Sequence, residues 1–352
     1  MDFKKILLDK DSLNDMKEIS FDELLTEPLN KDPSNTDIEY IYKFSFYKKF
    51  KLIVKRYLID FLNIFLKEKK IYQKNRSVEE VKSKYEKIAG SYIDDFYNHE
   101  KSEDGTLKKR DYVGFNHHEN KIYLIKGGRS IDPSINIVSK FCNHHNLKSL
   151  IEVGAGELTT LYPVIKKVNN LDFISALELS PNRLKHGNSF LKEKGIQIDH
   201  LIACDASNIP YEDNSFDISF TQYCIEQVPQ LAKKIIDEMI RISSKYVIII
   251  EPSYQFSNKI TKNRILHKGF PMLKENHFKN LNAKIIYRDG LPFTRYALYG
   301  EITILEKITK NEGKPILRHP TNYQKIELDN EFMIYGENKI KIKDGIIDFS
   351  KV

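Results

Sequence analysis

The 352-residue sequence has no tryptophan, three cysteines and no long apolar run. Cys142, Cys204 and Cys224 are widely spaced and form no Cys-x-x-Cys pair, which argues against a disulfide framework and against a cysteine-based zinc site. We expect Cys204 and Cys224, both in apolar strand contexts, to be inert core thiols. No stretch reaches the roughly 18 apolar residues of a membrane span, and the N-terminus lacks a signal-peptide pattern. We therefore expect a cytoplasmic protein.

The net charge of +7 is unevenly distributed. Residues 43–76 hold eleven lysines or arginines and two acids, an excess of nine positive charges. Such a segment can bind nucleic acid, an anionic membrane or acidic substrates, or it can be a solvated surface. Its aromatic and apolar residues recur at spacings of three and four, which predicts an amphipathic helix with a stripe formed by Phe50, Val54, Tyr57, Phe61 and Phe65. We expect the stripe to pack on the rest of the protein or on a second copy, with docking to a membrane surface as the alternative.

The N-terminal third predicts two regions. Residues 1–38 are acidic and polar, and we expect loosely ordered chain or short helices there. Residues 39–130 predict a helical, basic cap region. In it, Ser77-Val-Glu-Glu80 has the spacing of a capping box and begins a helix that continues to Phe96. The polar residues 99–129 predict a loop or lid.

Beyond the cap region, residues 131–310 predict a main domain and residues 311–352 a small β appendage. The main domain alternates short apolar runs with helical stretches, which indicates a doubly wound, mostly parallel α/β sheet covered on both faces. The predicted strands are 150–153, 173–179, 201–204, 216–220 and 246–250, and the predicted helices are 158–168, 182–193 and 230–242. Two further runs, 284–287 and 301–305, are joined by too short a segment for a crossover helix and predict an antiparallel pair.

Polar residues follow four of these strands. Gly154 and Gly156 end the first, Glu178 the second, Asp205 the third and Gln222 the fourth. Because ligands of doubly wound sheets bind at the carboxyl ends of the strands, these residues predict a nucleotide-shaped site. A carboxylate can accept from both hydroxyls of a ribose, and Glu178 follows Gly156 by 22 residues, close to the roughly 20 expected for such an acid.

The pattern Glu152-x-Gly154-x-Gly156, Glu178, Asp205-Ala206 with Ile209-Pro210, and Ser215-Phe216-Asp217 resembles the class I S-adenosylmethionine-dependent methyltransferases. The resemblance implies a Rossmann-like, mostly parallel sheet of seven strands and S-adenosylmethionine as cofactor. It also implies that the glycine turn passes the methionine part of the cofactor, that Glu178 binds the ribose and that Asp205 reads the adenine amino group. The implied cofactor-binding residues are Glu152, Gly154, Ala155, Gly156, Glu178, Leu179, Asp205, Ala206 and Gln222. A dinucleotide fingerprint would require glycine at Thr159, and its absence favours the methyl donor over NAD.

The methyl acceptor side is less defined. His117 and His118 could reach the cleft from the predicted lid, and Tyr223 and Glu226 follow the fourth strand, where acceptors of that family commonly lie. Arg295 and Tyr296 stand between the last two strands. No residue is an obvious base, so His117, His118 and Tyr223 are carried as catalytic candidates. Asp217 is interpreted as a structural residue at a strand start.

The C-terminal segment carries a second resemblance. Ile316-Leu-Arg-His-Pro320 and Ile342-Lys-Asp-Gly-Ile-Ile347 resemble the Trm112-like module that is often fused to bacterial methyltransferases. That module usually has Cys-Pro where this chain has His319-Pro320. Because the segment contains no cysteine, we expect a β appendage without zinc.

Together these features predict methyl transfer from S-adenosylmethionine to an oxygen or nitrogen of a small molecule, with a sugar or surface-glycan precursor as one acceptor class. An RNA methyltransferase that uses the basic segment and a non-catalytic cofactor-binding scaffold are the alternatives. Nucleic acid is disfavoured because the aromatics repeat at helical spacing, as in a packed stripe, rather than as exposed stacking platforms. Association of two copies and contact with a membrane surface stay open.

Overall fold

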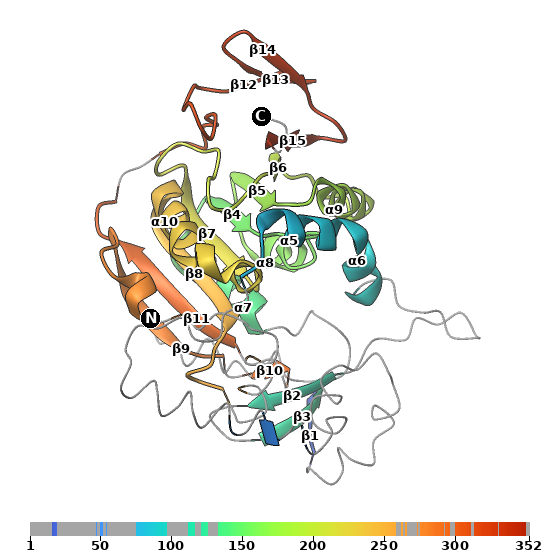
Figure 1. Cartoon of the computed structure of the whole chain (residues 1–352), viewed down its shortest axis with the longest axis vertical. Helices are drawn as coiled ribbons and strands as arrows, with labels where there is room; N and C mark the ends of the chain where they lie inside the picture. Colours follow the sequence, from blue (N-terminus) through green and yellow to red (C-terminus); the bar gives the residue numbers. More distant parts are fainter. Residues whose placement is uncertain are drawn as a thin grey trace, which may run out of the picture.

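The structure, a computed structural model, describes residues 16–19, 47, 50, 51, 54, 75–96, 112–116, 121–125, 133–257, 262, 265, 273, 275–291, 293–295, 300–310, 313–329 and 331–349. Its centre is an eight-stranded sheet in the order β15-β6-β5-β4-β7-β8-β11-β9 (Figure 1). The strands are β4 (Ser149–Val153), β5 (Phe173–Glu178), β6 (His200–Ala203), β7 (Phe216–Gln222), β8 (Ser243–Pro252), β9 (Ala283–Gly290), β11 (Gly300–Lys307) and β15 (Ile346–Asp348).

The five predicted parallel strands are confirmed as β4 to β8, and β9 and β11 form the predicted antiparallel pair. Successive residues of each strand point to opposite faces, so both faces carry apolar side chains: Leu150 belongs to one buried cluster and Ile151 to the other. The first cluster packs under α7 (Pro133–His144), α8 (Leu161–Lys167) and α9 (Pro181–Glu193). The second packs under α10 (Ala232–Ile242). The helix α7, with Phe141 buried, was not predicted.

The cap region contains both helices and strands. The capping box is confirmed at the start of α5 (Val78–Lys87), where Ser77 accepts from the Glu80 amide and Glu80 from the Ser77 amide. The helix does not continue to Phe96 as predicted. It ends before Gly90, whose φ of +96° is incompatible with a helix, and α6 (Ser91–Phe96) begins anew.

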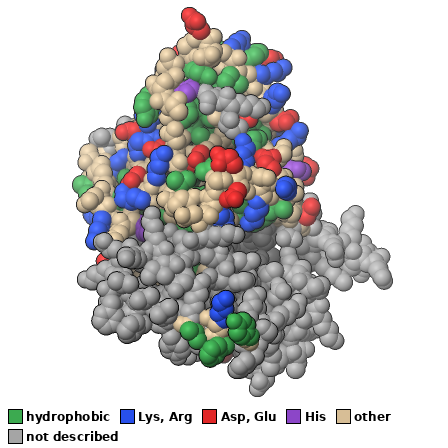
Figure 2. Space-filling view, viewed as in Figure 1, with side chains coloured by type: hydrophobic (Ala, Val, Ile, Leu, Met, Phe, Trp, Pro, Cys, Tyr) green, Lys and Arg blue, Asp and Glu red, His purple; other side chains and the backbone are tan. Residues whose placement is uncertain are grey.

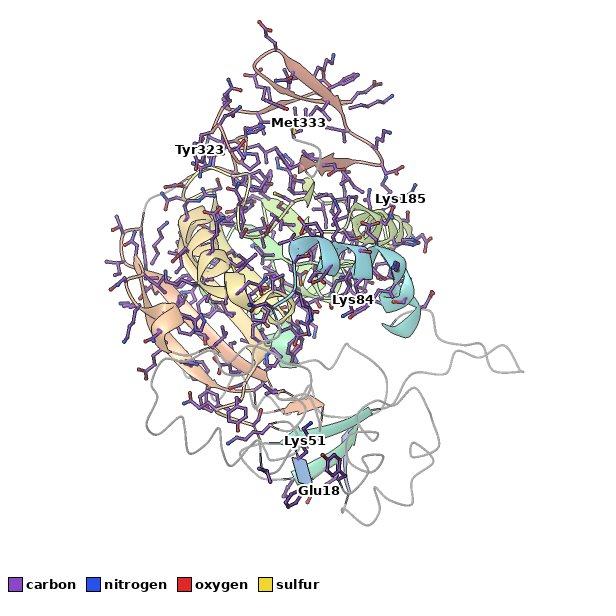
Figure 3. All side chains as sticks on the ribbon, in the orientation of Figure 1. Glu18, Lys51, Lys84, Lys185, Tyr323 and Met333 are labelled. Carbon is purple, nitrogen blue, oxygen red and sulfur yellow. The ribbon has the colours of Figure 1, made fainter. Side chains whose placement is uncertain are left out.

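A second sheet, in the order β1-β3-β2-β10, is built from distant parts of the chain (Figure 1). It comprises β1 (Met16–Ile19), β2 (Tyr112–Asn116), β3 (Lys121–Ile125) and β10 (Phe293–Arg295). Two predictions are corrected here. The expected loop or lid at 99–129 contains an antiparallel strand pair, and a strand replaces helix or loose chain at 16–19. Glu18 on β1, labelled in Figure 3, forms an ion pair of 2.9 Å with Lys121 on β3.

The predicted aromatic stripe is described at two of its positions. Phe50 and Val54 are helical and 57% and 48% exposed, and Tyr47, one helical turn earlier, is 74% exposed. Phe50 and Val54 therefore do not pack on the rest of the chain, and packing on a second copy or docking to a membrane surface stays a prediction. Tyr57, Phe61 and Phe65 lie outside the described residues.

The C-terminal segment forms a three-stranded sheet of β12 (Glu327–Leu328), β13 (Phe332–Tyr335) and β14 (Asn338–Lys341), and then returns to the main sheet. There β15 pairs in parallel with β6, so the sheet has one strand more than the seven predicted. Lys185 on α9 lies below this segment (Figure 3), and its Nζ is 3.1 Å from Asp344. The appendage is thus fastened to the main domain by its last strand.

We predict that Ile347→Ala destabilises the whole domain. Ile347 is 3% exposed within β15, and removing a buried Ile side chain costs about 2–5 kcal/mol. Urea unfolding measures the change, with Ile308→Ala as control because Ile308 is 64% exposed and its truncation should cost less than about 0.5 kcal/mol. Equal stability of the two variants would show that β15 is not part of the cooperative fold.

Candidate functional site

The carboxyl ends of β6, β5, β4 and β7 lie side by side in the main sheet. The chain runs from β4 through α8, β5 and α9 to β6 on one side, and β7 lies on the other side of β4. The point where strand order reverses is therefore beside β4, which is where doubly wound sheets bind ligands. The predicted residues Gly154, Glu178, Asp205 and Gln222 stand at the ends of these four strands, and the structure brings them to one edge.

The turn after β4 is held across the end of β5 by main-chain bonds. The amides of Gly154 and Ala155 both donate to the Leu177 carbonyl, at 2.8 and 2.9 Å. The amide of Gly156 then donates to Oε2 of Glu178 at 2.9 Å. Gly154 and Gly156 have φ of +77° and +57°, which side chains rarely adopt. The glycine turn and the predicted ribose-binding acid are thus in direct contact.

Cys224 explains why residue 154 has no side chain. A Cβ built on Gly154 would lie 2.4 Å from both Cβ and Sγ of Cys224, which follows β7. Burial, followed by the charge of Glu251, raises the pKa of the Cys224 thiol well above its usual value. Burial likewise raises the pKa of Cys204 to about 12. Cys204 is therefore a buried, protonated thiol as predicted, whereas Cys224 is protonated but only half-buried.

We predict that Gly154→Ala disrupts the turn. The left-handed conformation costs about 1–2 kcal/mol for a residue with a side chain, and the collision with Cys224 adds about 1–3 kcal/mol of overpacking. The control is Gly195→Ala, because Gly195 has φ of +68° but nothing within 4 Å of a built Cβ. Urea unfolding measures the loss of stability in both variants. Gly195→Ala reports the backbone strain alone, and Gly154→Ala reports the strain together with the collision. A loss no larger for Gly154→Ala than for Gly195→Ala would contradict the close packing.

Glu178 is 5% exposed and makes several contacts besides the turn. Its Oε1 accepts from the Ser180 amide at 3.1 Å, and its Oε2 lies 3.9 Å from Nη1 of Arg183. Arg183 was not predicted. It lies in the first turn of α9, and its Nε donates to Oε1 of the buried Glu157 at 3.4 Å. Burial lowers the pKa of Arg183, but Glu178, Tyr92 and Glu157 raise it by more, so the net pKa lies above its ordinary value.

The predicted adenine side lies at the end of β6. Oδ1 of the half-buried Asp205 accepts from the Ser207 amide at 2.8 Å, which fixes the carboxylate over its own loop. Ala206 is half-buried beside it, and Ile209 is fully buried. A fixed carboxylate beside apolar side chains is suited to an amino group on a flat aromatic ring.

The end of β7 carries a strained residue. Tyr223 has φ of +55°, although it is not glycine, and its amide donates to the Ile250 carbonyl at 2.9 Å. A tyrosine in this conformation costs of order 1–3 kcal/mol, which persists only where the surroundings enforce it, and such residues cluster at functional sites. Gln222, one residue earlier, is 9% exposed.

Glu251 holds the three residues that follow Tyr223 and was missed in the sequence. It stands near the end of β8 and is fully buried. Its Oε1 accepts from the amides of Cys224 and Ile225 at 2.9 and 2.7 Å, and its Oε2 from the amide of Glu226 at 3.0 Å. Burial, and then the nearby Glu226, raise the pKa of Glu251 well above 4.5. The Glu-Pro pair that ends the apolar run at 246–250 was the only signal for it.

We predict that Glu251 makes stability fall as pH rises. A raised pKa means that the native state holds the proton more tightly than the unfolded chain. The stabilisation is complete below pH about 4.5 and is lost as the pH rises through the raised value. Urea unfolding from pH 4 to 8 should show this decline in the wild type and a shallower one in Glu251→Gln, which cannot titrate there. Because burial also raises the pKa of Glu301, only the difference between the proteins is diagnostic. Parallel curves would refute the assignment.

The remaining predicted residues are placed as follows. Glu152 is 2% exposed inside β4, and Leu179 is half-buried after β5. Glu226 is 8% exposed, and its carbonyl accepts from Nη1 of Arg76 at 3.4 Å, so the cap region reaches the loop after β7. Asp217 lies at the opposite end of β7, pairs with Lys245 at 2.7 Å and is structural, as interpreted.

Other candidates cannot be placed at the site. His117, His118 and Tyr296 lie outside the described residues, and Arg295 is described only as part of β10. In the C-terminal segment, Nδ1 of His319 accepts from the amides of Thr321 and Asn322 at 3.2 and 3.3 Å. His319 therefore organises its own turn. Among the described residues, no three His, Cys, Asp or Glu side chains are grouped as a metal site requires, and no helix is long and apolar enough to cross a bilayer.

Comparison with known proteins finds similarity over part of the chain. Residues 151–249 match the family model described as a methyltransferase domain. The chain is 32% identical over 112 residues to norajmaline N-methyltransferase of Rauvolfia serpentina, covering 32% of this chain and 37% of that protein. It is 26% identical over 120 residues to a sterol 4-C-methyltransferase of Caenorhabditis elegans, covering 34% and 32%. The chain thus spans about a third of the length of these curated relatives.

Among solved structures, magnesium protoporphyrin IX methyltransferase of Synechocystis, crystallised with S-adenosylhomocysteine, aligns with a TM-score of 0.42 at 9% identity. The alignment covers 51% of this chain and 84% of that protein.

Proposed function

We propose that this chain, whose residues 151–249 form a methyltransferase domain, transfers a methyl group from S-adenosylmethionine to an oxygen or nitrogen of a small molecule. The observation that carries the proposal is the contact between the Gly156 amide and the Glu178 carboxylate at the switch point of the sheet. This contact places a turn with glycine at 154 and 156 directly beside a buried carboxylate, that of Glu178, which has two acceptor oxygens. When bound, S-adenosylmethionine supplies an electrophilic methyl group on a sulfonium sulfur.

The residues present fit this cofactor. Glu178 is suited to both ribose hydroxyls, since each carboxylate oxygen can accept more than the one amide it now holds. Asp205 is suited to the adenine amino group between Ala206 and Ile209. Gly154 and Gly156 allow the left-handed turn that would carry the backbone past the methionine part, while Cys224 and Arg183 fill the space that a Cβ would need.

The acceptor would lie beside the loop after β7. There Glu251 fixes residues 224–226 through their amides, and Arg76 closes on the loop from the cap region. Methyl transfer needs the nucleophile in line with the sulfonium carbon, so a rigid loop contributes mainly by positioning. Tyr223, in its strained conformation, stays a candidate for contact with the acceptor, as do His117 and His118 from outside the described residues.

A small metabolite is the acceptor class that the relatives' names favour, an alkaloid in one case and a sterol in the other. A sugar or surface-glycan precursor is a narrower suggestion to be tested with it. On the face drawn in Figure 2, acidic and basic side chains are interspersed over the described part and do not gather into one basic patch. An acceptor without a long phosphate backbone fits such a surface.

One observation favours the RNA alternative. Tyr47 and Phe50 are exposed on a helix within the basic segment 43–76, and Phe50 of the expected stripe is not packed on the rest of the chain. Exposed aromatics beside lysines can stack on bases. RNA binding through this segment would weaken steeply as salt is raised.

We predict that S-adenosylhomocysteine binds the full chain and that Glu178→Ala and Asp205→Ala each weaken it at least about 10-fold. A hydrogen bond to a charged group contributes about 1.5–3 kcal/mol, and each 1.4 kcal/mol is tenfold in affinity. Calorimetry measures the affinities. Asp237→Ala is the control, because Asp237 is an exposed acid on α10 that pairs with Lys233. Failure of the wild type to bind, or equal binding by all variants, would remove the basis of the proposal.

The acceptor class is tested by incubating the protein with labelled methyl donor and fractionated cell extract. Label in a low-mass product that survives nuclease treatment supports a small-molecule acceptor. Nuclease-sensitive label that disappears at high salt supports the RNA reading, and cofactor binding without any transfer supports the scaffold.

A further inference from the structure

The helices α5 and α6, here called the cap helices, are joined to the glycine turn at 154–156 by a buried ionic cluster. Glu157, the residue after Gly156, is fully buried, and its Oε2 accepts from the amides of Tyr92 and Ile93 at 3.0 and 2.9 Å. These amides belong to the first turn of α6, so Glu157 caps that helix from the turn itself. The position of α6 is therefore fixed by the residue next to the cofactor-binding glycine.

Arg183 is the centre of this cluster. Its guanidinium carbon lies 4.7 Å from the ring centroid of Tyr85 on α5 and 4.6 Å from that of Tyr92 on α6. A Cβ built on Gly156 would lie 2.6 Å from its Nη2. Arg183 is 7% exposed and reaches both Glu157 and Glu178. One side chain thus touches both cap helices, the glycine turn and the predicted ribose-binding acid.

Helix stability does not account for an arginine at this position. Arg183 is in the first turn of α9, where the helix dipole disfavours a positive charge. Burying a guanidinium also costs free energy unless ion pairs and hydrogen bonds compensate. The compensation comes from two carboxylates and two aromatic rings, all of which face the turn or the cap. The contacts that stabilise the buried guanidinium are therefore the same contacts that connect the glycine turn to the cap helices.

We propose that Arg183 is a positioning residue that fixes the Glu178 carboxylate for the ribose hydroxyls and makes this fit depend on the cap helices α5 and α6. The proposal rests on the proposed function, in which Glu178 binds the ribose. To accept from two neighbouring hydroxyls, a carboxylate must turn both of its oxygens toward the ribose. The Gly156 and Ser180 amides hold one oxygen each, and the Arg183 guanidinium, in contact with the rings of Tyr85 and Tyr92, restricts the rotation that remains.

The test compares the affinities of S-adenosylhomocysteine and its 2′,3′-dideoxy analogue for the full chain by calorimetry. The wild type should prefer the diol about 10- to 100-fold, as expected for hydrogen bonds to a charged group. Arg183→Met should reduce this preference to within about threefold. Arg183→Lys should restore only part of it, because lysine keeps the charge but not the planar group that contacts the rings of Tyr85 and Tyr92.

The matched control is Arg288→Met. Arg288 is half-buried, pairs with the buried Glu301 at 2.9 Å and lies 5.1 Å from the centroid of the Phe278 ring. It stands on β9, away from the glycine turn. This variant should lose stability and keep the wild-type preference. If Arg183→Met does not fold, Tyr92→Leu removes one of the two rings that the guanidinium contacts and leaves its ion pairs, and it should reduce the preference about two- to fivefold.

The outcomes separate the two proposals. If the wild type does not bind S-adenosylhomocysteine, the proposed function fails and this inference fails with it. If the wild type prefers the diol and Arg183→Met weakens both ligands by the same factor, Arg183 is merely structural and only the inference is overturned. An unchanged preference in both Arg183→Met and Tyr92→Leu has the same meaning.

Discussion

The site depends on one constraint, the crossing of the turn after β4 over the end of β5. Three consecutive amides of this turn are bound to β5, two by the Leu177 carbonyl and the third, from Gly156, by Glu178. The crossing brings the turn so close to its neighbours that Cys224 lies against Gly154 and Arg183 against Gly156. Because there is no room for a Cβ on either side, the glycines, the acid and their neighbours form one packed unit, and none of them can be exchanged independently.

Sequence patterns were sufficient to predict the elements that depend on neighbouring residues. Apolar runs buried on both faces predicted β4 to β8, and the capping box predicted the start of α5, since both depend on nearby residues only. The acids at strand ends could also be predicted, because topology alone brings the ends of parallel strands together. The resemblance to the methyltransferases added roles to positions that were already candidates.

Features that depend on contacts between distant residues could not be predicted. Glu251 acts on amides about 25 residues away, and Arg183 acts on helices that lie some 90 to 100 residues earlier in the chain. Neither position has a local pattern that distinguishes it from an ordinary buried charge. The eighth strand was missed for the same reason, since β15 joins β6 across 145 residues and its short apolar run fits a surface hairpin equally well. The exposure of Phe50 and Val54 shows that helical periodicity alone does not identify what a stripe packs against.

The buried charges around the site share a single geometry. Glu157 binds the amides that open α6, and Glu251 binds the amides that open the short helix after β7. In both cases a side chain from the sheet edge holds the start of a loop or helix that borders the site. Such buried groups are costly, and apolar residues of similar volume would often stabilise the fold as well or better. What these acids contribute is orientation. A carboxyl group bound to two or three amides fixes the direction of the backbone that carries them, whereas apolar packing fixes only its position. Orientation is what the proposed methyl transfer would require, since the nucleophile, the methyl carbon and the departing sulfur must lie on one line.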